Sequence, residues 1–459
     1  GPNGLAAAIA MAQRGRSVTI YEAQPTIGGG VRSAELTLPG FIHDTCSAVY
    51  PLAVGSPFFA TLPLEQHGLK WVEPPVPLAH PLDDGTAILL ERSVDATAKN
   101  LGIDGEAYRN LMGPLVENWP ALSADILAPW HWPSRPFSFA RFGLRAIRPA
   151  RGLAEKIFQG ERAQALFAGL AAHSMLPLEY PASAAFGLIL GATAHTVGWP
   201  IARGGAQKLT DALASYFRIL GGTIISNKPV TSLEEFPRCR IILCDLTPRQ
   251  LLKVAGDRFS ARYRRSLERY HYGMGAFKVD WALSGPVPWK APACARAATV
   301  HLGGCLSDIA ASERSVWAGA YAEQPFVLLV QPSLFDRSRA PGMKHTLWSY
   351  CHVPNGSSLN MLEKIEAQIE RFAPGFRDLV LARSVRGPLE LQKHNANLVG
   401  GDINGGAPTL RQLFLRPTFR RYKTSVRGLY ICSASTPPGG GVHGMCGYLA
   451  ACQALEEIS

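Results

Sequence analysis

The sequence predicts an α/β protein built from two interleaved domains, and three observations lead to this prediction. The chain begins with a glycine turn that runs into a helix and a strand, and its end repeats strand, glycine-rich loop and helix. The segments between these ends alternate strand-like and helix-like patterns. With 459 residues, the chain is also too long for one ordinary hydrophobic core, so we expect two domains.

The opening stretch GPNGLAAAIAMAQRGRSVTIYEA (1–23) has the element order of a dinucleotide-binding unit. Gly1 and Gly4 form a turn where a phosphate can approach the backbone, and the following helix offers free N–H groups. Glu22 ends the next strand, where its carboxylate can accept a hydrogen bond from a ribose hydroxyl. Gly1 and Gly4 match the second and third glycines of G-x-G-x-x-G. We therefore expect the first strand and first glycine of this unit to lie upstream of residue 1.

A second glycine-rich loop follows closely, at Gly28, Gly29 and Gly30. Its glycines allow another close approach of the backbone, and Arg32 is placed to face a phosphate. A glycine triplet by itself also suits a flexible loop. Its position just beyond Glu22 favours a second contact with the same ligand.

Residues 61–195 differ in character from the chain ends. The stretch PLDDGTAILLERS (81–93) predicts a hairpin that turns at Asp84 and Gly85. Helical patterns follow, together with a group of aromatic residues beside two arginines. This group suits ordinary packing, a lid or a surface that faces a membrane. Its members are Trp119, Trp130, Trp132, Phe137, Phe139 and Phe142, with Arg141 and Arg145.

Alternating patterns return after residue 195. Apolar spacing predicts a helix over 206–219 that stops at Gly221, followed by strands in TIIS and PVTSL. Three further strands are expected in AFKVDWAL, PFVLLVQP and HTLWSYCHV.

The segment LNMLEKIEAQIERFAP (359–374) predicts an amphipathic helix. Leu362, Ile365 and Ile369 are expected on its buried face. Glu366 is expected on its solvent face, in the row of polar positions that runs along the other side.

The end of the chain, VRGLYICSASTPPGGGVHGMCGYLAACQALEEI (426–458), predicts a second strand, glycine-rich loop and helix. The N-terminus of this helix can point at an electron-rich ligand. The glycines at 439–441 leave room for a flat ring against the backbone. His443 is the candidate catalytic residue of this loop, although a histidine there can equally cap the backbone.

Charge and composition narrow the classes of function. The formal net charge is +11, and basic residues gather in 135–156, 258–272 and 416–427. Such runs are typical of solvated helix faces, and they also suit an anionic membrane surface or an acidic partner. No nucleic-acid-binding fold or aromatic–basic repeat accompanies them, which argues against nucleic acid as a partner.

Other chemistries find little support in the sequence. The nine cysteines are scattered and lack CxxC spacing, so we expect neither a disulfide framework nor a metal site. Cys239 and Cys244 flank a strand-like run whose odd separation sends their side chains to opposite faces, which argues against a redox pair. We find no paired carboxylates or Ser/His/Asp set for hydrolysis, and no apolar run of about 18 residues that would span a membrane.

The whole chain resembles the phytoene-desaturase-like FAD oxidoreductases, within the amine-oxidase-type flavoprotein group, and in particular the branch of pyridine nucleotide-disulphide oxidoreductase domain-containing protein 2. Four segments carry the resemblance and span both chain ends. They are GPNGLAAAIAMAQRGRSVTIYEA, GGGVRS, ARGGAQKLTDAL…GGTI and GGDINGG…QLFLRP…GLYICSASTPPGGGVHGMCGYLAA.

The resemblance implies a Rossmann-like FAD-binding domain of the amine-oxidase and phytoene-desaturase type, interleaved with a mixed-sheet plus helical substrate domain. The implied FAD-binding domain comprises residues 1–60, 196–265 and 396–459. The substrate or lid domain comprises 61–195 and 266–395.

The resemblance also implies the residues that bind FAD. Gly1 and Gly4 would lie on the pyrophosphate and Glu22 on the adenosine ribose. Val230, in a strand after GGTIISNKP, would face the adenine through its backbone. The residues implied at the phosphates, ribityl chain and flavin are Gly28, Gly29, Arg32, Ser433, Ala434, Ser435, Thr436, Gly439, Gly440, Gly441, Val442 and His443.

The implied function is FAD-dependent dehydrogenation, desaturation or saturation of C–C bonds in a hydrophobic substrate such as an isoprenoid. We expect FAD alone, because no second complete nucleotide fingerprint appears, and a quinone or oxygen as electron acceptor. Two alternatives stay open: a flavin-fold protein that acts mainly through partners, and an amine oxidase. The Ala/Arg/Pro-rich composition favours a cytoplasmic protein, and peripheral membrane contact stays open as an alternative.

Overall fold

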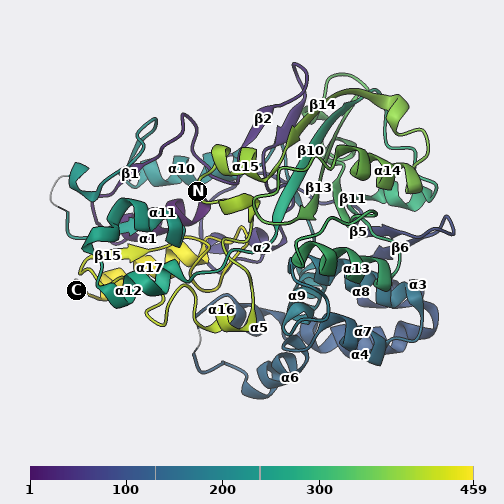
Figure 1. The fold of residues 1–459 in the computed structure, drawn as a ribbon, viewed down its shortest axis with the longest axis horizontal. Coiled ribbons are helices and arrows are strands. Elements are labelled where there is room, and N and C mark those ends of the chain that lie inside the picture. The colour runs from purple at the N-terminus through teal and green to yellow at the C-terminus, as the bar shows by residue number, and fades with distance from the viewer. Residues whose placement is uncertain (130, 237–238, 458–459) are drawn as a thin grey trace.

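The computed structural model describes residues 1–129, 131–236 and 239–457. Figure 1 shows three parts: an α/β part on the left, a large sheet at the upper right and a group of helices at the lower right. The two chain ends both belong to the left-hand part, which we call the dinucleotide part on the grounds given below.

The dinucleotide part consists of short strands and the helices that pack on them. Its elements are α1 (Pro2–Ala12), β1 (Thr19–Tyr21), α10 (Gln207–Ile219), β8 (Thr223–Ile225), β9 (Ile242–Cys244), α11 (Pro248–Ala255), α12 (Ala261–Glu268), β15 (Leu429–Ile431) and α17 (Met445–Glu456). Strand β1 pairs in parallel with β8, and β15 pairs in parallel with β9. Parallel pairs covered by helices are the mark of an α/β fold. The helix predicted over 206–219 is confirmed as α10.

The strand predicted in PVTSL is wrong, because residues 229–233 form no ladder. The Glu235 carboxylate accepts hydrogen bonds from the backbone N–H groups of Thr231 (2.7 Å) and Ser232 (2.8 Å), which a strand would give to a neighbour. Pro229 has no N–H to donate. Val230 therefore lies in an irregular segment.

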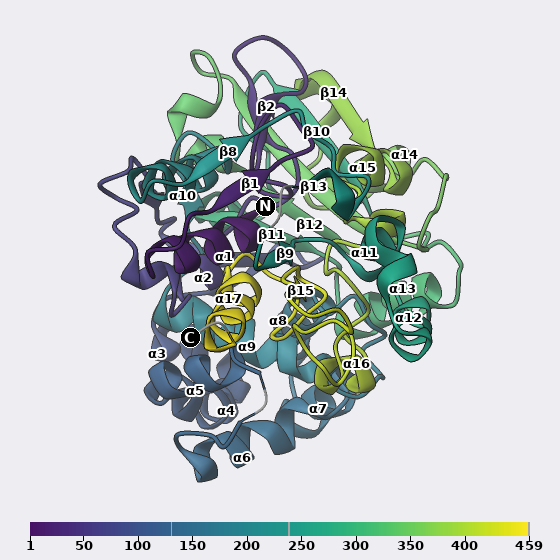
Figure 2. The same ribbon diagram turned by 90° about the vertical axis from the view of Figure 1, so that its left-hand side faces the viewer.

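Helices from opposite ends of the chain pack directly on each other. Helix α1 lies against α17 and α10, and Figure 2 shows α1 and α17 side by side. A Cβ atom built on Gly447 of α17 would stand 1.8 Å from the carbonyl oxygen of Asn3, so only glycine allows this approach. The two glycine-rich units predicted at the chain ends are thus parts of one structure.

The large sheet has seven strands in the order β14-β10-β13-β12-β11-β5-β6. Their bounds are β5 (Val76–Pro81), β6 (Ala87–Leu90), β10 (Gly275–Leu283), β11 (Ala297–Leu302), β12 (Val327–Val330), β13 (His345–Val353) and β14 (Val380–Arg386). All neighbours are antiparallel except β11 and β5. Strands β5 and β6 confirm the predicted hairpin at Asp84 and Gly85.

Side chains alternate between the two faces of this sheet. On β13, Leu347 and Cys351 face a core that includes α14 (Leu362–Phe372), whereas Trp348 and Tyr350 face the opposite side. The helix predicted in 359–374 is thus confirmed, but its Glu366 is 2% exposed rather than solvated. Its Oε1 accepts from Trp281 Nε1 at 2.9 Å and from Arg383 Nε at 2.6 Å.

A group of helices fills the lower part of Figure 1, towards the right. They are α3 (Val94–Asn100), α4 (Gly105–Glu117), α5 (Trp119–Ile126), α6 (Pro136–Ala146), α7 (Ala150–Ile157), α8 (Glu161–Ala172) and α9 (Ser183–Thr196). They share one hydrophobic core with the Trp348 face of the sheet. In the described ranges, no helix combines the length and the apolar character that crossing a bilayer requires.

The remaining helices and strands complete the fold. They are β2 (Ser33–Glu35), β3 (Ile42–Asp44), α2 (Pro51–Val54), β4 (Trp71–Val72), β7 (Ile201–Ala202), α13 (Leu306–Trp317), α15 (Pro388–His394) and α16 (Leu410–Phe414).

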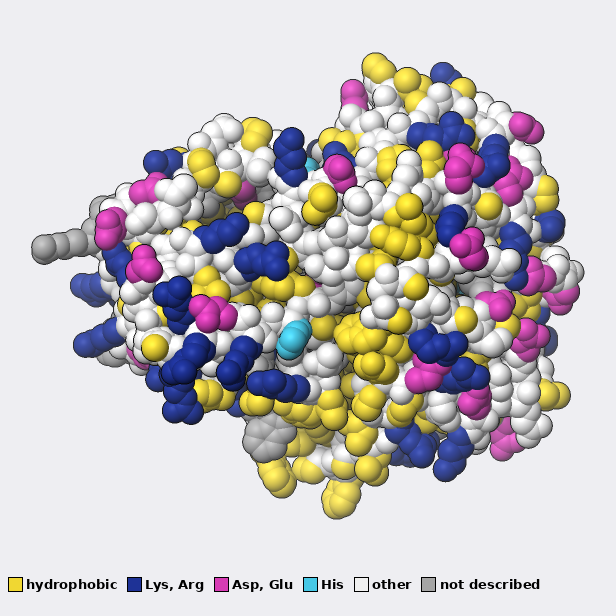
Figure 3. Space-filling model, in the orientation of Figure 1, with side chains coloured by type: hydrophobic (Ala, Val, Ile, Leu, Met, Phe, Trp, Pro, Cys, Tyr) yellow, Lys and Arg dark blue, Asp and Glu magenta, His cyan; other side chains and the backbone are white. Residues whose placement is uncertain are grey.

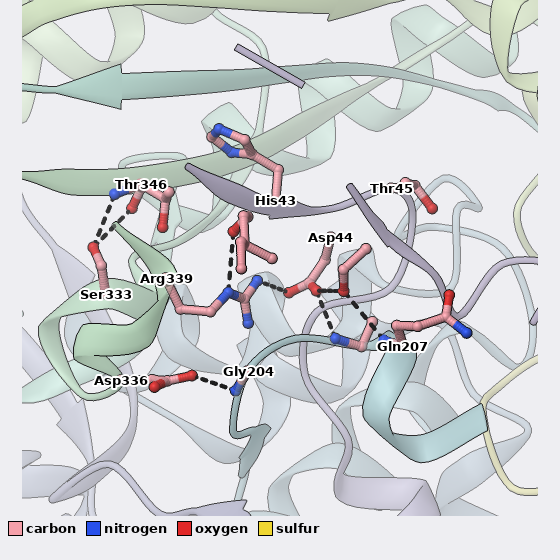
Figure 4. A network of polar contacts seen from close by, with 12 residues as sticks. His43, Asp44, Thr45, Gly204, Gln207, Ser333, Asp336, Arg339 and Thr346 are labelled. Atoms are coloured by element: carbon pink, nitrogen blue, oxygen red, sulfur yellow. Dashed lines mark hydrogen bonds and ion pairs between the residues drawn. The ribbon is translucent and has the colours of Figure 1, made fainter. Parts of the chain in front are cut away.

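A buried polar network also holds the parts together (Figure 4). Arg339, in the segment before β13, places Nη2 at 2.6 Å from Asp44 Oδ2, and both side chains are about 1% exposed. Asp44 Oδ1 accepts from Ser33 Oγ at 2.8 Å and from the backbone N–H of Ala206 at 2.7 Å. The backbone N–H of Gly204 donates to Asp336 at 2.6 Å. The network thus fixes the start of α10 against the sheet.

Candidate functional site

A single large cavity runs between the dinucleotide part and the sheet. Its volume is about 1270 Å³, which exceeds the roughly 300–1,000 Å³ of a pocket for one drug-sized ligand. One end is lined by α1, β1 and β9, and the other by the sheet and α9. The cavity can therefore hold a dinucleotide together with a second molecule.

The N-terminal glycine turn and the predicted ribose acid lie at one end of this cavity. Gly1, Gly4, Glu22 and Val230 all line it. The N–H of Gly4, in the first turn of α1, donates to Asp245 Oδ2 at 3.0 Å. A carboxylate held at this point agrees with the preference of a helix N-terminus for anions. Sequence reasoning missed Asp245, which follows β9.

The middle of the cavity is formed by the second glycine loop. Gly29 and Arg32 line it, whereas Gly28 does not. Gly28 has φ +129° and its added Cβ would stand 2.5 Å from the carbonyl oxygen of Val31, so it shapes the turn. Arg32 is 5% exposed and donates to two carbonyl oxygens, those of Gly29 (3.0 Å) and His394 (3.1 Å).

Arg32 carries a positive charge that the protein itself leaves without a close counterion. Among the described residues it forms no ion pair within 4 Å, and burial lowers the pKa of its guanidinium. An uncompensated buried charge is costly. Its position on the cavity wall therefore suits an anionic ligand group.

The C-terminal loop lines the cavity only in part. Ser433, Ala434, Gly441 and Val442 line the cavity. The other predicted residues of this loop are not among the cavity-lining residues. They are Ser435, Thr436, Gly439, Gly440 and His443.

Gly439 and Gly440 of this loop meet neighbouring protein rather than the cavity. A Cβ on Gly439 would stand 2.7 Å from Arg416 Nη1, and one on Gly440 2.8 Å from the carbonyl oxygen of Asn404. Gly440 and Gly439 thus allow the loop to pack tightly, which is a different role from the predicted room for a flat ring.

His443 has the geometry of a helix cap. It is 1% exposed, and its Nδ1 accepts from the backbone N–H of Met445 at 3.0 Å, at the start of α17. Burial lowers its pKa to about 4, so the ring is neutral near pH 7. Of the two roles that the sequence left open, capping is the one for which His443 is positioned.

At the other end, the sheet contributes residues that sequence reasoning did not single out. Lys278 on β10 lines the cavity and is ion-paired with Asp280, two residues along the same strand. Both side chains are buried. Burial lowers the pKa of Lys278, and the Asp280 carboxylate opposes that shift. The alternation of a lysine and an aspartate in the apolar run AFKVDWAL was the available signal, since it places both on one face.

The far end of the cavity is walled by aromatic and aliphatic side chains and one histidine. The aromatic rings of Trp348 and Tyr350 are 5.3 Å apart at an interplanar angle of 84°, and Trp199, Leu190 and Leu328 complete the apolar wall. His173 also lines this end, and its Nε2 lies 3.0 Å from His301 Nε2. Burial lowers the pKa of His173 to about 3, so it is neutral near pH 7.

The remaining expectations concern cysteines and metals. Cys239 is exposed and Cys244 is buried, and both are free thiols. In the parts of the chain that the structure describes, no cluster of three or more His, Cys, Asp or Glu side chains could hold a metal ion.

The residues at the dinucleotide end fit FAD. Glu22 can accept a hydrogen bond from a ribose hydroxyl, and Arg32 can pair with a diphosphate. Gly29 brings its backbone to the cavity wall. A Cβ atom built on Gly29 would stand 3.0 Å from Gly1 Cα. The cavity also continues past this end, which leaves space for a substrate beside the cofactor's reactive end.

Comparison with known proteins agrees with this geometry. Residues 1–60 match the model of the NAD(P)-binding Rossmann-like domain. Pyridine nucleotide-disulfide oxidoreductase domain-containing protein 2 from Mus musculus is 26% identical, over 100% of this chain and 92% of the mouse protein.

Solved structures share the fold over the whole chain. An oxidoreductase from Methanosarcina mazei superimposes with a TM-score of 0.67 at 15% identity, covering 99% of this chain and 97% of that one. Cyclohexylamine oxidase from Brevibacterium oxydans gives 0.61 at 15% identity, covering 100% and 97%.

These comparisons confirm the predicted resemblance, the predicted fold class and the predicted oxidoreductase class. The chain is thus an oxidoreductase with a Rossmann-like dinucleotide-binding domain, similar over its whole length to pyridine nucleotide-disulfide oxidoreductase domain-containing protein 2.

Proposed function

We propose that this protein is an FAD-dependent oxidoreductase that dehydrogenates or saturates a C–C bond of a neutral, hydrophobic substrate such as an isoprenoid. The observation that carries the proposal is the single cavity with two chemically different ends. One end offers Glu22 and Arg32 to a dinucleotide, and the other is lined by Trp199, Leu328 and Tyr350.

When bound, FAD supplies the two-electron redox chemistry, and the protein supplies binding and orientation. Arg32 neutralises diphosphate charge while two backbone carbonyls hold its guanidinium in place. Glu22 accepts a ribose hydrogen bond, and its Oε1 is oriented by the backbone N–H of Gln24 at 3.0 Å. The fixed side chains therefore bind the cofactor with little reorganisation.

The apolar end selects the substrate by charge as well as by shape. The acidic residues among the described cavity-lining residues are Glu22 and Asp245, and both lie at the dinucleotide end. At the other end Lys278 is paired with Asp280, so the cavity wall there offers no free carboxylate among the described lining residues to hold an ammonium group. Aromatic walls exclude water there, which favours an uncharged hydrocarbon over a polar molecule.

His173 is one of the polar groups at the apolar end, and we assign it a positioning role. Its low pKa makes it a weak proton acceptor at neutral pH. Its Nε2 is engaged with His301. A neutral imidazole held in this way can hydrogen-bond a single polar group of the substrate or of the electron acceptor, for which a quinone or oxygen is the candidate.

Amine oxidation is the second candidate, because solved amine oxidases share this fold. The aromatic pair Trp348 and Tyr350 would suit an amine by cation–π contact. The lack of a carboxylate among the described residues that line the cavity at that end argues for the hydrocarbon instead.

The test is anaerobic reduction of the flavin in the purified chain reconstituted with FAD. Squalene should bleach the flavin absorbance and cyclohexylamine should not. The variant Leu328→Arg should still bind the flavin, but squalene should no longer bleach it. The control Ile219→Arg, at an exposed residue of α10, should change neither flavin binding nor bleaching. Bleaching by the amine alone would favour amine oxidation. Flavin that binds but is bleached by neither compound would favour a protein that acts through partners.

A further inference from the structure

Helix α6 and the loop before it present large apolar side chains to solvent. Phe137 is 93% exposed, Trp132 80%, Leu144 70% and Ile147 49%. Single exposed apolar residues are ordinary, but a group of them marks an interaction surface. We call these four residues the α6 patch. Figure 3 shows hydrophobic side chains gathered along the lower edge of the molecule, where Figure 1 places α6.

The α6 patch is not needed to bury the helix. The opposite face of α6 carries Phe142 (7% exposed) and Ala146 (6%), which belong to the core shared by the helices. Helix α6 packs on α9 through this inner face. Phe137, Leu144 and Ile147 recur at helical spacing along the outer face. The outer stripe therefore remains available to a partner.

The charged residues of the chain segment that forms the patch are of one sign. Between residues 126 and 154 the sequence holds five arginines and no aspartate or glutamate. Arg135, Arg141 and Arg148 are exposed. Arg141 and Arg148 form no ion pair with any described residue. An apolar stripe flanked by unpaired arginines is complementary to a bilayer surface, where anionic headgroups cover an apolar interior.

The last acidic residue before this stretch, Asp125, is bonded to residues of the loop that follows it. Asp125 is 8% exposed. It accepts from the backbone N–H and Oγ of Ser134, and His131 Nε2 lies 3.0 Å from its Oδ1. These contacts hold the loop that presents Trp132, so the carboxylate shapes the patch without neutralising its outer face.

We propose that the α6 patch docks on the surface of an anionic lipid bilayer. Phe137, Leu144 and Trp132 enter the boundary between headgroups and acyl chains, and the arginines lay their stems along the apolar surface while pairing with lipid phosphates. Helix α9, on which α6 packs, contributes Leu190 to the cavity wall. Docking therefore places the helical part of the molecule against the lipid. The proposal does not depend on the proposed redox function.

The test is sedimentation of the full chain with phosphatidylcholine vesicles, with and without phosphatidylserine. Binding is expected for the anionic vesicles and should weaken with salt. The double variant Phe137→Ser/Leu144→Ser should bind at least about tenfold more weakly. Arg141→Gln/Arg148→Gln should bind roughly thirtyfold more weakly.

Helix α10 offers matched controls on another side of the molecule. Ile219 is 72% exposed and follows an exposed Arg218. Ile219→Ser and Arg218→Gln should leave vesicle binding unchanged. Thermal melting of every variant checks that the fold is retained.

Tryptophan fluorescence reports the docking site itself. Anionic vesicles should shift the emission to shorter wavelength, and Trp132→Phe should remove most of that shift. No binding, equal binding to neutral vesicles, or binding unaffected by both double variants would overturn the proposal. A dimer in solution that Phe137→Ser/Leu144→Ser dissociates, without vesicle binding, would assign the patch to a second copy. Vesicle binding is measured with and without added FAD. A failure of the chain to bind FAD can then be told apart from a failure to bind vesicles.

Discussion

Replacing Arg339 by methionine should destabilise the fold by about 3 kcal/mol. Arg339 is fully buried, and its Nη2 and Nε donate to Asp44 (2.6 Å) and to the carbonyl oxygen of Ile42 (3.0 Å). Removing one partner of a buried ion pair leaves the other charge without compensation, at a cost of about 3–5 kcal/mol. Asp44 keeps two donors, Ser33 Oγ and the Ala206 N–H, so we expect the lower value.

The assay is urea denaturation followed by circular dichroism. Asp83→Asn provides the control, because it breaks an ion pair with Arg371 in which Asp83 is 58% exposed. Such a pair contributes about 0–1 kcal/mol. If Arg339→Met costs no more than Asp83→Asn, then burial of the Asp44 pair does not hold the parts together as we reason.

Three further outcomes test the cofactor end and the packing of the chain ends. Arg32→Met should weaken FAD binding about ten- to a hundredfold, because it removes a charge-assisted hydrogen bond. A flavin fluorescence titration measures the affinity. The control Arg14→Met, at an exposed residue, should bind FAD as well as the parent protein. The free energy of unfolding should fall as pH drops from about 6.5 towards 4, by roughly 1.4 kcal/mol per pH unit for each buried neutral histidine. The reason is that His443 has a pKa of about 4 in the fold, so the unfolded chain takes up the proton first. Urea denaturation at several pH values should therefore give a shallower dependence for His443→Gln, and an unchanged slope would contradict the assignment. Gly447→Ala should lower the melting temperature severely, because the new Cβ would lie 1.8 Å from the carbonyl oxygen of Asn3 in α1. Gly152→Ala is the control. A Cβ on Gly152 has no heavy atom within 4 Å, so this variant should raise or preserve the melting temperature.

The elements at the chain ends could be predicted because their signals are local. The turn, helix, strand and acid of residues 1–22 follow one another in sequence, and so do the apolar spacing and glycine stop of α10. The hairpin of β5 and β6 follows from Asp84 and Gly85 in the same way. Hydrogen bonds and side-chain periodicity within such stretches need no distant partner.

The two ends of the cavity differ in how much of them could be predicted. Gly4, Glu22 and Arg32 belong to contiguous motifs, and the structure places all three on the cavity wall. Lys278 and His173 come from β10 and from the residue after α8, elements that only the fold brings to one cavity. Their neighbours in sequence carry no motif, so their convergence could not be read along the chain.

The amino-acid order by itself determined many of the helices and strands, α10 and the β5–β6 hairpin among them, and that the glycine-rich ends make a dinucleotide-type unit. The tertiary structure decided where polar groups lie. Glu366 occupies a solvent position by helical periodicity, yet Trp281 and Arg383 from two strands cover it. His443 sits in a glycine loop that could face a ligand, yet its ring binds the backbone of α17. A carboxylate or an imidazole is buried only where other elements supply its hydrogen bonds, and those partners are set by packing across the molecule rather than by spacing along the chain.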